Sequence, residues 1–197
     1  MTADFEERAM ERLRQAGLSE EHIQRQKKII FQDTHKDYYY DKVEETDQSC
    51  DRVPVEKITA IKTTPPVRDR SVYDLFMETQ GEDGTARFEA ALESLEKQGL
   101  AKLQTAYGTT RTNEAAQPMV FHYYKEDDCY SGENEGTDQI IAAKMFQVPF
   151  LTGKIATYRL NEEKKKLYDE YESFRELVRL TDLRGLTMDI FQEKKKS

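Results

Sequence analysis

Acidic side chains are concentrated between residues 126 and 138, where they could bind a divalent cation. The segment has no Lys or Arg after Lys125 and contains Glu126, Asp127, Asp128, Glu133, Glu135 and Asp138. Carboxylate oxygens are the ligands that Mg²⁺ and Ca²⁺ prefer, but this spacing does not match the loop of an EF-hand. A solvated acidic loop is therefore our default interpretation, and the sequence leaves the question of a metal open.

Three other residues have side chains that often take part in chemistry. His122 precedes the acidic segment, and we expect an ordinary strand residue there rather than a ligand or a base. Cys50 and Cys129 are the only cysteines, too few and too far apart for a disulfide framework or a zinc site. We expect both to be free thiols.

A turn, a short helix and a strand are predicted in the segment that begins at Gly136. Gly136 gives the backbone freedom for a tight turn, and Thr137 or Asp138 can cap the helix that follows. Ala142 and Ala143 are small enough for this helix to lie close against a sheet. The apolar run after the helix is too short for anything but a strand.

This unit resembles the nucleotide-contacting turn of the ParB/sulfiredoxin superfamily, whose pattern is Gly-x-His/Arg-Arg-x-x-Ala-Ala-Lys followed by a Val/Ile-Pro strand. The chain has the glycine, the two alanines, Lys144 and the Val-Pro pair, but Asp138 and Gln139 stand at the two cationic positions. The order of a Val-Pro-Val-Glu-Lys-Ile strand, a Pro/Arg loop and a helix ending at Gly99 is also similar. The resemblance covers about residues 52–158 and implies an α+β, ParB/sulfiredoxin-like domain.

In nucleotide-using members of this superfamily, the turn presents backbone N–H groups and a guanidinium to phosphates at a helix N-terminus. Carried over residue by residue, the resemblance implies a candidate nucleotide site of Arg68, Arg70, Gly136, Thr137, Asp138, Gln139 and Lys144. A carboxylate at the position of Asp138 repels a phosphate unless a metal ion intervenes. We therefore expect no cofactor, with a nucleotide and Mg²⁺ as the alternative.

The same departures argue against catalysis. Sulfiredoxin chemistry needs a cysteine where this chain has Thr137. Phosphotransfer, as in related free-serine kinases, needs a carboxylate base and groups that bind the phosphate. Glu56 could be the base, but Asp138 and Gln139 replace two of the phosphate-binding residues. We expect no catalytic residues and interpret the chain as a non-catalytic, diverged protein-interaction or regulatory module. The alternative is a nucleotide-binding switch or phosphotransferase with a rebuilt, metal-assisted site.

The composition limits the partners of the protein. The 197 residues are 35% charged and 37% hydrophobic and carry a formal net charge of −8, which predicts one domain with a modest core. This charge opposes non-specific nucleic-acid binding and suits a basic protein partner.

No apolar run is long enough to cross a bilayer, and the N-terminus lacks the pattern of a signal peptide, so we expect a cytoplasmic protein. The oligomeric state is not predicted.

Residues 1–51 are predicted as a helical N-terminal arm that ends in a polar linker over 41–51. A first helix ends at Gly17, and Ser19 caps a second helix that extends beyond Ile30. The tyrosines at 38–40 could form a stacking platform for bases, but we favour a role in anchoring the arm to the main domain through buried rings.

Within residues 52–158, alternating polarity predicts one half-buried strand from Val53 to Ile58. Ser71 should cap a short helix, and a longer helix containing Leu92 should end at Gly99. Residues 101–116 are predicted as an inserted loop or hairpin. The segments 117–121, 148–150 and 154–158 are then predicted as strands.

Residues 159–197 are predicted as C-terminal helices with a basic tail. Asn161 should cap a long helix, in which one face carries an apolar stripe of Leu167, Tyr171, Phe174 and Val178. We favour packing of this stripe on the domain or on the N-terminal helices. The alternative is a self-association seam.

Overall fold

The structure is a computed structural model that describes residues 3–32, 35–43, 50–63, 67, 70–77, 91–108, 118–133 and 136–177. Several residues singled out in the sequence, including Arg68, Glu135, Val178 and the basic tail, lie outside these ranges. The described residues have the α+β fold predicted above, with helices packed around one mixed sheet. No helix among them is long and apolar enough to cross a membrane.

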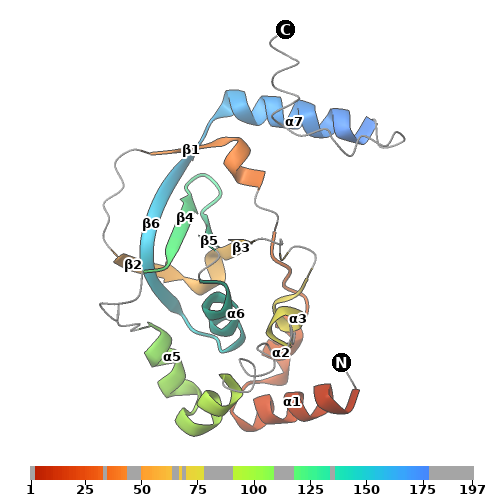
Figure 1. The fold of residues 1–197 in the computed structure, drawn as a ribbon, viewed down its shortest axis with the longest axis vertical. Coiled ribbons are helices and arrows are strands. Elements are labelled where there is room, and N and C mark those ends of the chain that lie inside the picture. The colour runs from red at the N-terminus through yellow and green to blue at the C-terminus, as the bar shows by residue number, and fades with distance from the viewer. Residues whose placement is uncertain are drawn as a thin grey trace.

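The sheet follows the order β1-β6-β4-β5-β3, with β2 on the same edge of β6 as β1. The strands are β1 (Tyr40–Lys42), β2 (Cys50–Pro54), β3 (Ile58–Lys62), β4 (Val120–Tyr124), β5 (Cys129–Glu133) and β6 (Phe150–Leu160). Both β1 and β2 pair antiparallel with β6, β4 pairs antiparallel with β5, and the pairs β3–β5 and β4–β6 are parallel. Figure 1 shows β6 as a long curved strand that runs along one side of the sheet, from near α6 up to α7.

Three strand predictions need correction. The strand predicted at 117–121 lies further along the chain, because β4 begins at Val120 and ends at Tyr124. The strands predicted separately at 148–150 and 154–158 are joined in β6, which begins at Phe150 and is 11 residues long, so Val148 and Pro149 precede it. The single strand predicted from Val53 to Ile58 is instead interrupted by the 3₁₀ turn η2 (Val55–Lys57). The Val55 N–H donates to the Pro149 carbonyl at 3.1 Å, so the interruption begins where β2 meets the start of β6.

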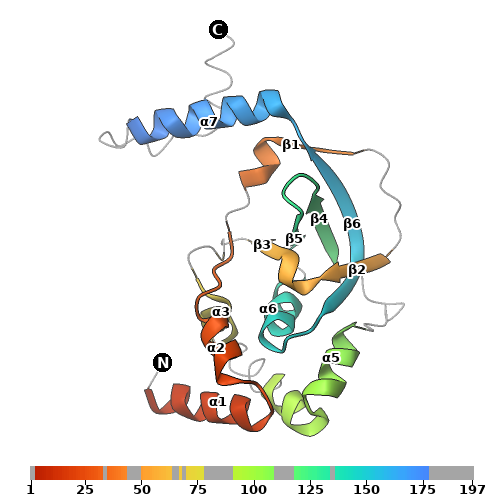
Figure 2. The same ribbon diagram turned by 180° about the vertical axis from the view of Figure 1, so that it is seen from behind.

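The helices gather at two ends of the sheet. Helices α1 (Ala3–Gln15), α2 (Glu20–Gln26), α3 (Val72–Met77) and α5 (Leu100–Gly108) lie together at one end, and α7 (Glu162–Leu177) crosses the other (Figures 1 and 2). Helix α6 (Thr137–Met145) packs beside the sheet, and residues 91–98 are also helical.

Most predicted helix ends are confirmed by hydrogen bonds or by backbone angles. The Ser19 hydroxyl accepts from the His22 N–H at 3.2 Å, Ser71 accepts from the Asp74 N–H at 2.9 Å, and Asn161 accepts from two amides of α7 at 3.1 Å. Gly17 and Gly99 end their helices with φ values of +101° and +75°, which a side chain disfavours.

Two helix predictions were wrong. The second helix ends at Gln26 and does not reach Ile30, because the chain turns into an extended segment that bridges Ile30 to Ser71. Residues 101–108 belong to helix α5 instead of an inserted loop, since Leu103 is buried and its N–H donates to the Gly99 carbonyl at 3.1 Å. The rest of that predicted insertion lies outside the described residues.

The N-terminal helices contribute to the main hydrophobic core. Leu13, Ile23 and Phe31 are buried in the same cluster as Phe121 of β4 and Leu151 of β6. The side chains predicted to form an arm therefore pack on the sheet. This core lies on the face of the sheet that α6 covers.

The apolar stripe of α7 packs only in part. Tyr171 is buried and Leu167 half-buried, whereas Phe174 is 41% exposed and Val178 is outside the described residues. Tyr168, which the predicted stripe omitted, is also buried; its ring lies 5.0 Å from that of Tyr39. The helix thus packs on the 3₁₀ turn η1 (His35–Tyr38) and the adjoining Tyr39, in agreement with the favoured packing within the chain.

Candidate functional site

The predicted turn at Gly136 starts α6, but its cap differs from the prediction. Gly136 itself is the N-cap residue, with φ −95° and ψ 0°, and no side chain caps the helix. Thr137 and Asp138 are therefore the first two helical residues rather than caps. This φ suits any residue, so the glycine matters here for space: a Cβ there would lie 3.2 Å from Met119 Sδ, and the Met119 side chain would have to shift by a few tenths of an ångström.

Helix α6 is buried as predicted. Ala143 is fully buried, Ala142 almost so, and Ile140 packs over Gly132 of β5, where an added Cβ would lie 2.2 Å from Ile140 Cδ1. The small side chains predicted for this helix therefore lie in the core.

The predicted nucleotide-site residues do not all lie at the turn. Asp138 and Gln139 are exposed at the start of α6, while Lys144 is buried in its last turn and donates to the Val55 carbonyl at 2.9 Å. Seven residues of helix separate Lys144 from Thr137, which corresponds to about 10 Å along the axis. Arg70 is half-buried beside the cap of α3, and it interacts with other parts of the chain, as do Thr137 and Asp138.

The acidic segment is only in part the solvated loop expected from the sequence. Residues 129–133 form strand β5, and the acidic residues before it form the turn of the β4–β5 hairpin. Their carboxylates hold other segments: Asp127 pairs with Lys36, Asp128 with Lys57 at 2.6 Å, and Glu126 accepts from the Leu160 N–H at 2.9 Å. Among the described residues, no group of three or more His, Cys, Asp or Glu could hold a metal ion.

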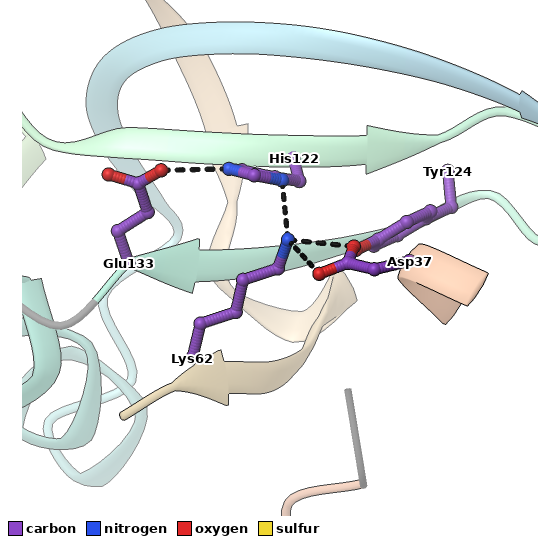
Figure 3. Close-up of polar contacts among 5 residues, drawn as sticks. All are labelled: Asp37, Lys62, His122, Tyr124 and Glu133. Carbon is purple, nitrogen blue, oxygen red and sulfur yellow. Dashed lines mark hydrogen bonds and ion pairs between the residues drawn. The ribbon is translucent and has the colours of Figure 1, made fainter. Parts of the chain in front are cut away.

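Figure 3 shows a polar cluster, defined here as Asp37, Lys62, His122, Tyr124 and Glu133. It lies on the sheet face opposite α6, because Gly132 and Phe121 face Ile140 of α6 and the residues next to them face away. The Lys62 Nζ lies 2.7 Å from His122 Nδ1 and donates to Asp37 at 2.8 Å. Asp37 also accepts from the Tyr124 hydroxyl at 2.9 Å. On the other side of the imidazole, His122 Nε2 lies 2.9 Å from Glu133 Oε1. Four elements, η1, β3, β4 and β5, supply these side chains.

The partners of His122 determine its tautomer. An ammonium can only donate, so Nδ1 accepts from Lys62 and the proton of the neutral imidazole resides on Nε2, which donates to Glu133. Burial lowers the pKa of His122, although the hydrogen bond to Glu133 acts in the opposite direction and Lys62 lowers it further. The ring of Tyr158 stacks on the imidazole, with centroids 4.9 Å apart and an interplanar angle of 10°. His122 is thus a neutral imidazole at pH 7.

The cluster contains the residue types of an acid–base site, but its members are hydrogen-bonded to one another. Both ring nitrogens of His122 and the Tyr124 hydroxyl have partners inside the cluster. Burial, and then the neighbouring Asp37, raise the pKa of Tyr124. A base that accepts a proton from a substrate needs a free lone pair, and the imidazole has none here. The arrangement instead attaches η1 to the sheet through Asp37.

Sequence reasoning missed this cluster. The sequence predicts an ordinary strand residue at His122, and of the other four side chains it indicates a chemical role only for Glu133, as part of the acidic segment. One local signal was present: His122 and Tyr124 are two residues apart on β4, so their side chains face the same side of the sheet. Nothing local indicated that Asp37 and Lys62 would join them.

Comparisons with known proteins add no relationship. No protein-family model matches the chain, and neither a curated protein nor a solved structure is significantly similar to it.

Proposed function

We propose that this chain is a non-catalytic protein-interaction module that presents the outer face of α7 to a protein partner. The observation that carries the proposal is the closed polar cluster. The group of residues best suited to chemistry is fully engaged in holding η1, and η1 in turn supports α7.

The contacts between η1 and α7 support this interpretation. Tyr38 stacks on Tyr168 with ring centroids 5.9 Å apart, and Tyr39 contacts the same ring. Lys36 pairs with Asp127 of the hairpin turn, so η1 is held by charge on one side and by rings on the other. A helix fixed in this way loses little conformational entropy on binding, which favours recognition by a partner.

The outer face of α7 has the mixed character of an interaction surface. Charged side chains border a shallow hollow that ends at Phe174, one of the exposed large apolar side chains of the described residues; its lining includes Glu162, Lys165, Lys166, Asp169, Glu170 and Ser173. An exposed aromatic bordered by charged residues is typical of protein contacts. Because the chain carries a net charge of −8, we propose a partner with a basic contact surface.

Co-purification from cells that make the protein tests this proposal, with quantification of each bound protein. Phe174→Glu should reduce recovery of the partner by about tenfold. Ala101→Glu is the control, since Ala101 is exposed on α5, at the other end of the molecule from α7, and should leave recovery unchanged. Equal recovery with both variants, or loss with both, would overturn the assignment to α7.

The proposal also includes a ParB/sulfiredoxin-like fold and a site that has lost nucleotide binding. The order of β2, the helices up to Gly99, β4, α6 and β6 supports a diverged ParB/sulfiredoxin-like domain over residues 52–158. Asp138 near the N-terminus of α6, with Lys144 about 10 Å away, supports a degenerate nucleotide site. Thermal melts with CTP, ATP, ADP and GTP, with and without Mg²⁺, should show no stabilisation. A ligand at a hundred times its Kd would add about 2.7 kcal/mol, and such a shift would refute the degenerate nucleotide site.

A further inference from the structure

A cavity of about 660 Å³ lies between the N-terminal segment and the sheet, away from the polar cluster. Its walls come from α2 and the segment after it, from β2, η2 and β3, and from the end of α6 with the start of β6. They include Ile29, Phe31, Val55, Val148 and Phe150. Pockets that bind small molecules commonly have this size and combine apolar walls with a few polar side chains.

One charged side chain on the wall of this cavity is almost fully buried. Lys144 is 7% exposed, and the Val55 carbonyl, 2.9 Å from Nζ, is the hydrogen-bond acceptor that the described residues offer it. An ammonium has three donors, so two remain for a ligand. The ring of Phe31, 5.8 Å from Nζ, faces the same group. A buried ammonium with so few acceptors is costly unless an anion joins it.

The other charged and titratable groups around the cavity leave Lys144 without a close counter-charge. Glu56 on η2 is exposed and acts on Lys144 only through space. On α2, Arg25 donates to His22 Nδ1 at 3.0 Å, and His22 Nε2 donates to the Met145 carbonyl at 2.9 Å. Gln26 is 4% exposed, and its Oε1 has no hydrogen-bond partner. The site thus combines unused donors with one unused acceptor.

We propose that this cavity binds a small organic carboxylate with an apolar body. The carboxylate accepts from the two remaining donors of Lys144, and the body lies against Phe31, Val148 and Phe150. The buried cation Lys144 matches one negative charge. The second cation on the wall, Arg25, is exposed and already donates to His22, so a carboxylate fits better than a phosphate with two charges. The unused Gln26 Oε1 favours ligands that also carry an N–H or O–H donor.

Binding should be coupled to protonation of Lys144. Burial lowers the pKa of Lys144 to about 8, with a smaller opposing effect from Glu56. A bound carboxylate stabilises the ammonium and raises this pKa, so binding at pH 8 takes up about half a proton. Affinity should then decrease as the pH rises above 8.

The test uses matched pairs of probes that differ only in charge: phenylacetate and phenylacetamide, indole-3-acetate and its amide, and hexanoate and hexanamide. Calorimetry on the full chain at pH 8, in buffers of different ionisation enthalpy, reports both affinity and proton uptake. We expect at least one acid to bind about tenfold more tightly than its amide and to take up protons.

The matched variants are Lys144→Met, which should abolish the preference for the acid, and Lys154→Met on β6, which should keep it. Equal binding of acid and amide, binding without proton uptake, or no binding by any of the six probes would overturn the proposal. The comparison of acid with amide and the measurement of proton uptake use the wild-type protein. They therefore test the proposed carboxylate site even if Lys144→Met does not fold.

Discussion

The Nζ atom of Lys62 lies 2.7 Å from Nδ1 of His122. Lys62 also pairs with Asp37, so its ammonium joins a residue near the N-terminus to the centre of the sheet. Because His122 must then accept on Nδ1, protonation of the imidazole would break this contact. The cluster therefore makes the stability of the fold sensitive to acid.

His122→Gln should reduce this sensitivity. Glutamine keeps an acceptor for Lys62 and a donor for Glu133 but does not titrate. The pKa of His122 is lowered from 6.5 in the folded state, so its contribution to stability is present above about pH 6.5 and is lost as the pH falls through the folded value. Urea unfolding between pH 7.5 and 5 should show a smaller loss for the variant than for the wild type.

His35→Gln is the control for this experiment, because His35 lies in η1 outside the cluster. Its pH profile should follow the wild type. If the stability of His122→Gln depends on pH as the wild type does, the conclusion that His122 is a buried, neutral imidazole is wrong.

Tyr168→Ala should release α7 from η1. The side chain is 9% exposed and its ring contacts Tyr38, Tyr39 and Tyr171, so its removal should cost about 2 to 4 kcal/mol. Amide hydrogen exchange over residues 162–177 should become faster. Phe174→Ala, on the exposed side of the helix, should change stability by less than about 1 kcal/mol. The reverse order of the two effects would mean that α7 packs through the other face.

Gly153→Ala should destabilise the sheet more than Gly132→Ala. A Cβ at residue 153 would lie 2.6 Å from the Met119 carbonyl oxygen and from Phe121 Cε2, and the backbone atom cannot move away. At residue 132 the clash is with Ile140 Cδ1, the end of a side chain that can rotate. Overpacking of this kind costs about 1 to 3 kcal/mol, and we expect Gly153→Ala at the upper end. Urea denaturation of both variants measures the difference.

Lys144→Met should remove a dependence of stability on alkaline pH. Because the pKa of Lys144 falls from 10.5 to about 8 on folding, its unfavourable contribution below pH 8 disappears as the ammonium deprotonates. The wild type should gain about 2 kcal/mol between pH 7.5 and 9.5 from this group, and the variant should not. Lys154→Met should retain the gain in the same urea titrations. A flat wild-type profile would show that Lys144 is solvated.

Features encoded by neighbouring residues could be predicted from the sequence. The caps at Ser19, Ser71 and Asn161 depend on a side chain and the amides two or three residues later, and the glycine at residue 99 acts on its own helix. The burial of α6 followed from its alanines. Each of these depends on contacts within a few residues.

Features that depend on distant segments could not be predicted from the sequence. Strand β5 has little apolar character of its own and is a strand because β3 and β4 pair with both of its edges. The polar cluster needs Asp37 beside Tyr124, 87 residues away, and no periodic pattern encodes that distance. The cavity likewise arises from three separate parts of the chain.

The pairing of β6 also dictates when the protein can fold during its synthesis. Strands β1, β2 and β4 all pair with β6, which begins only at residue 150 of 197. A nascent chain on the ribosome therefore holds these strands without their common partner until β6 has been translated. Their open edges can pair wrongly with other chains during that time. The sheet closes late, and a ribosome-bound chain that stops before residue 150 should remain sensitive to protease.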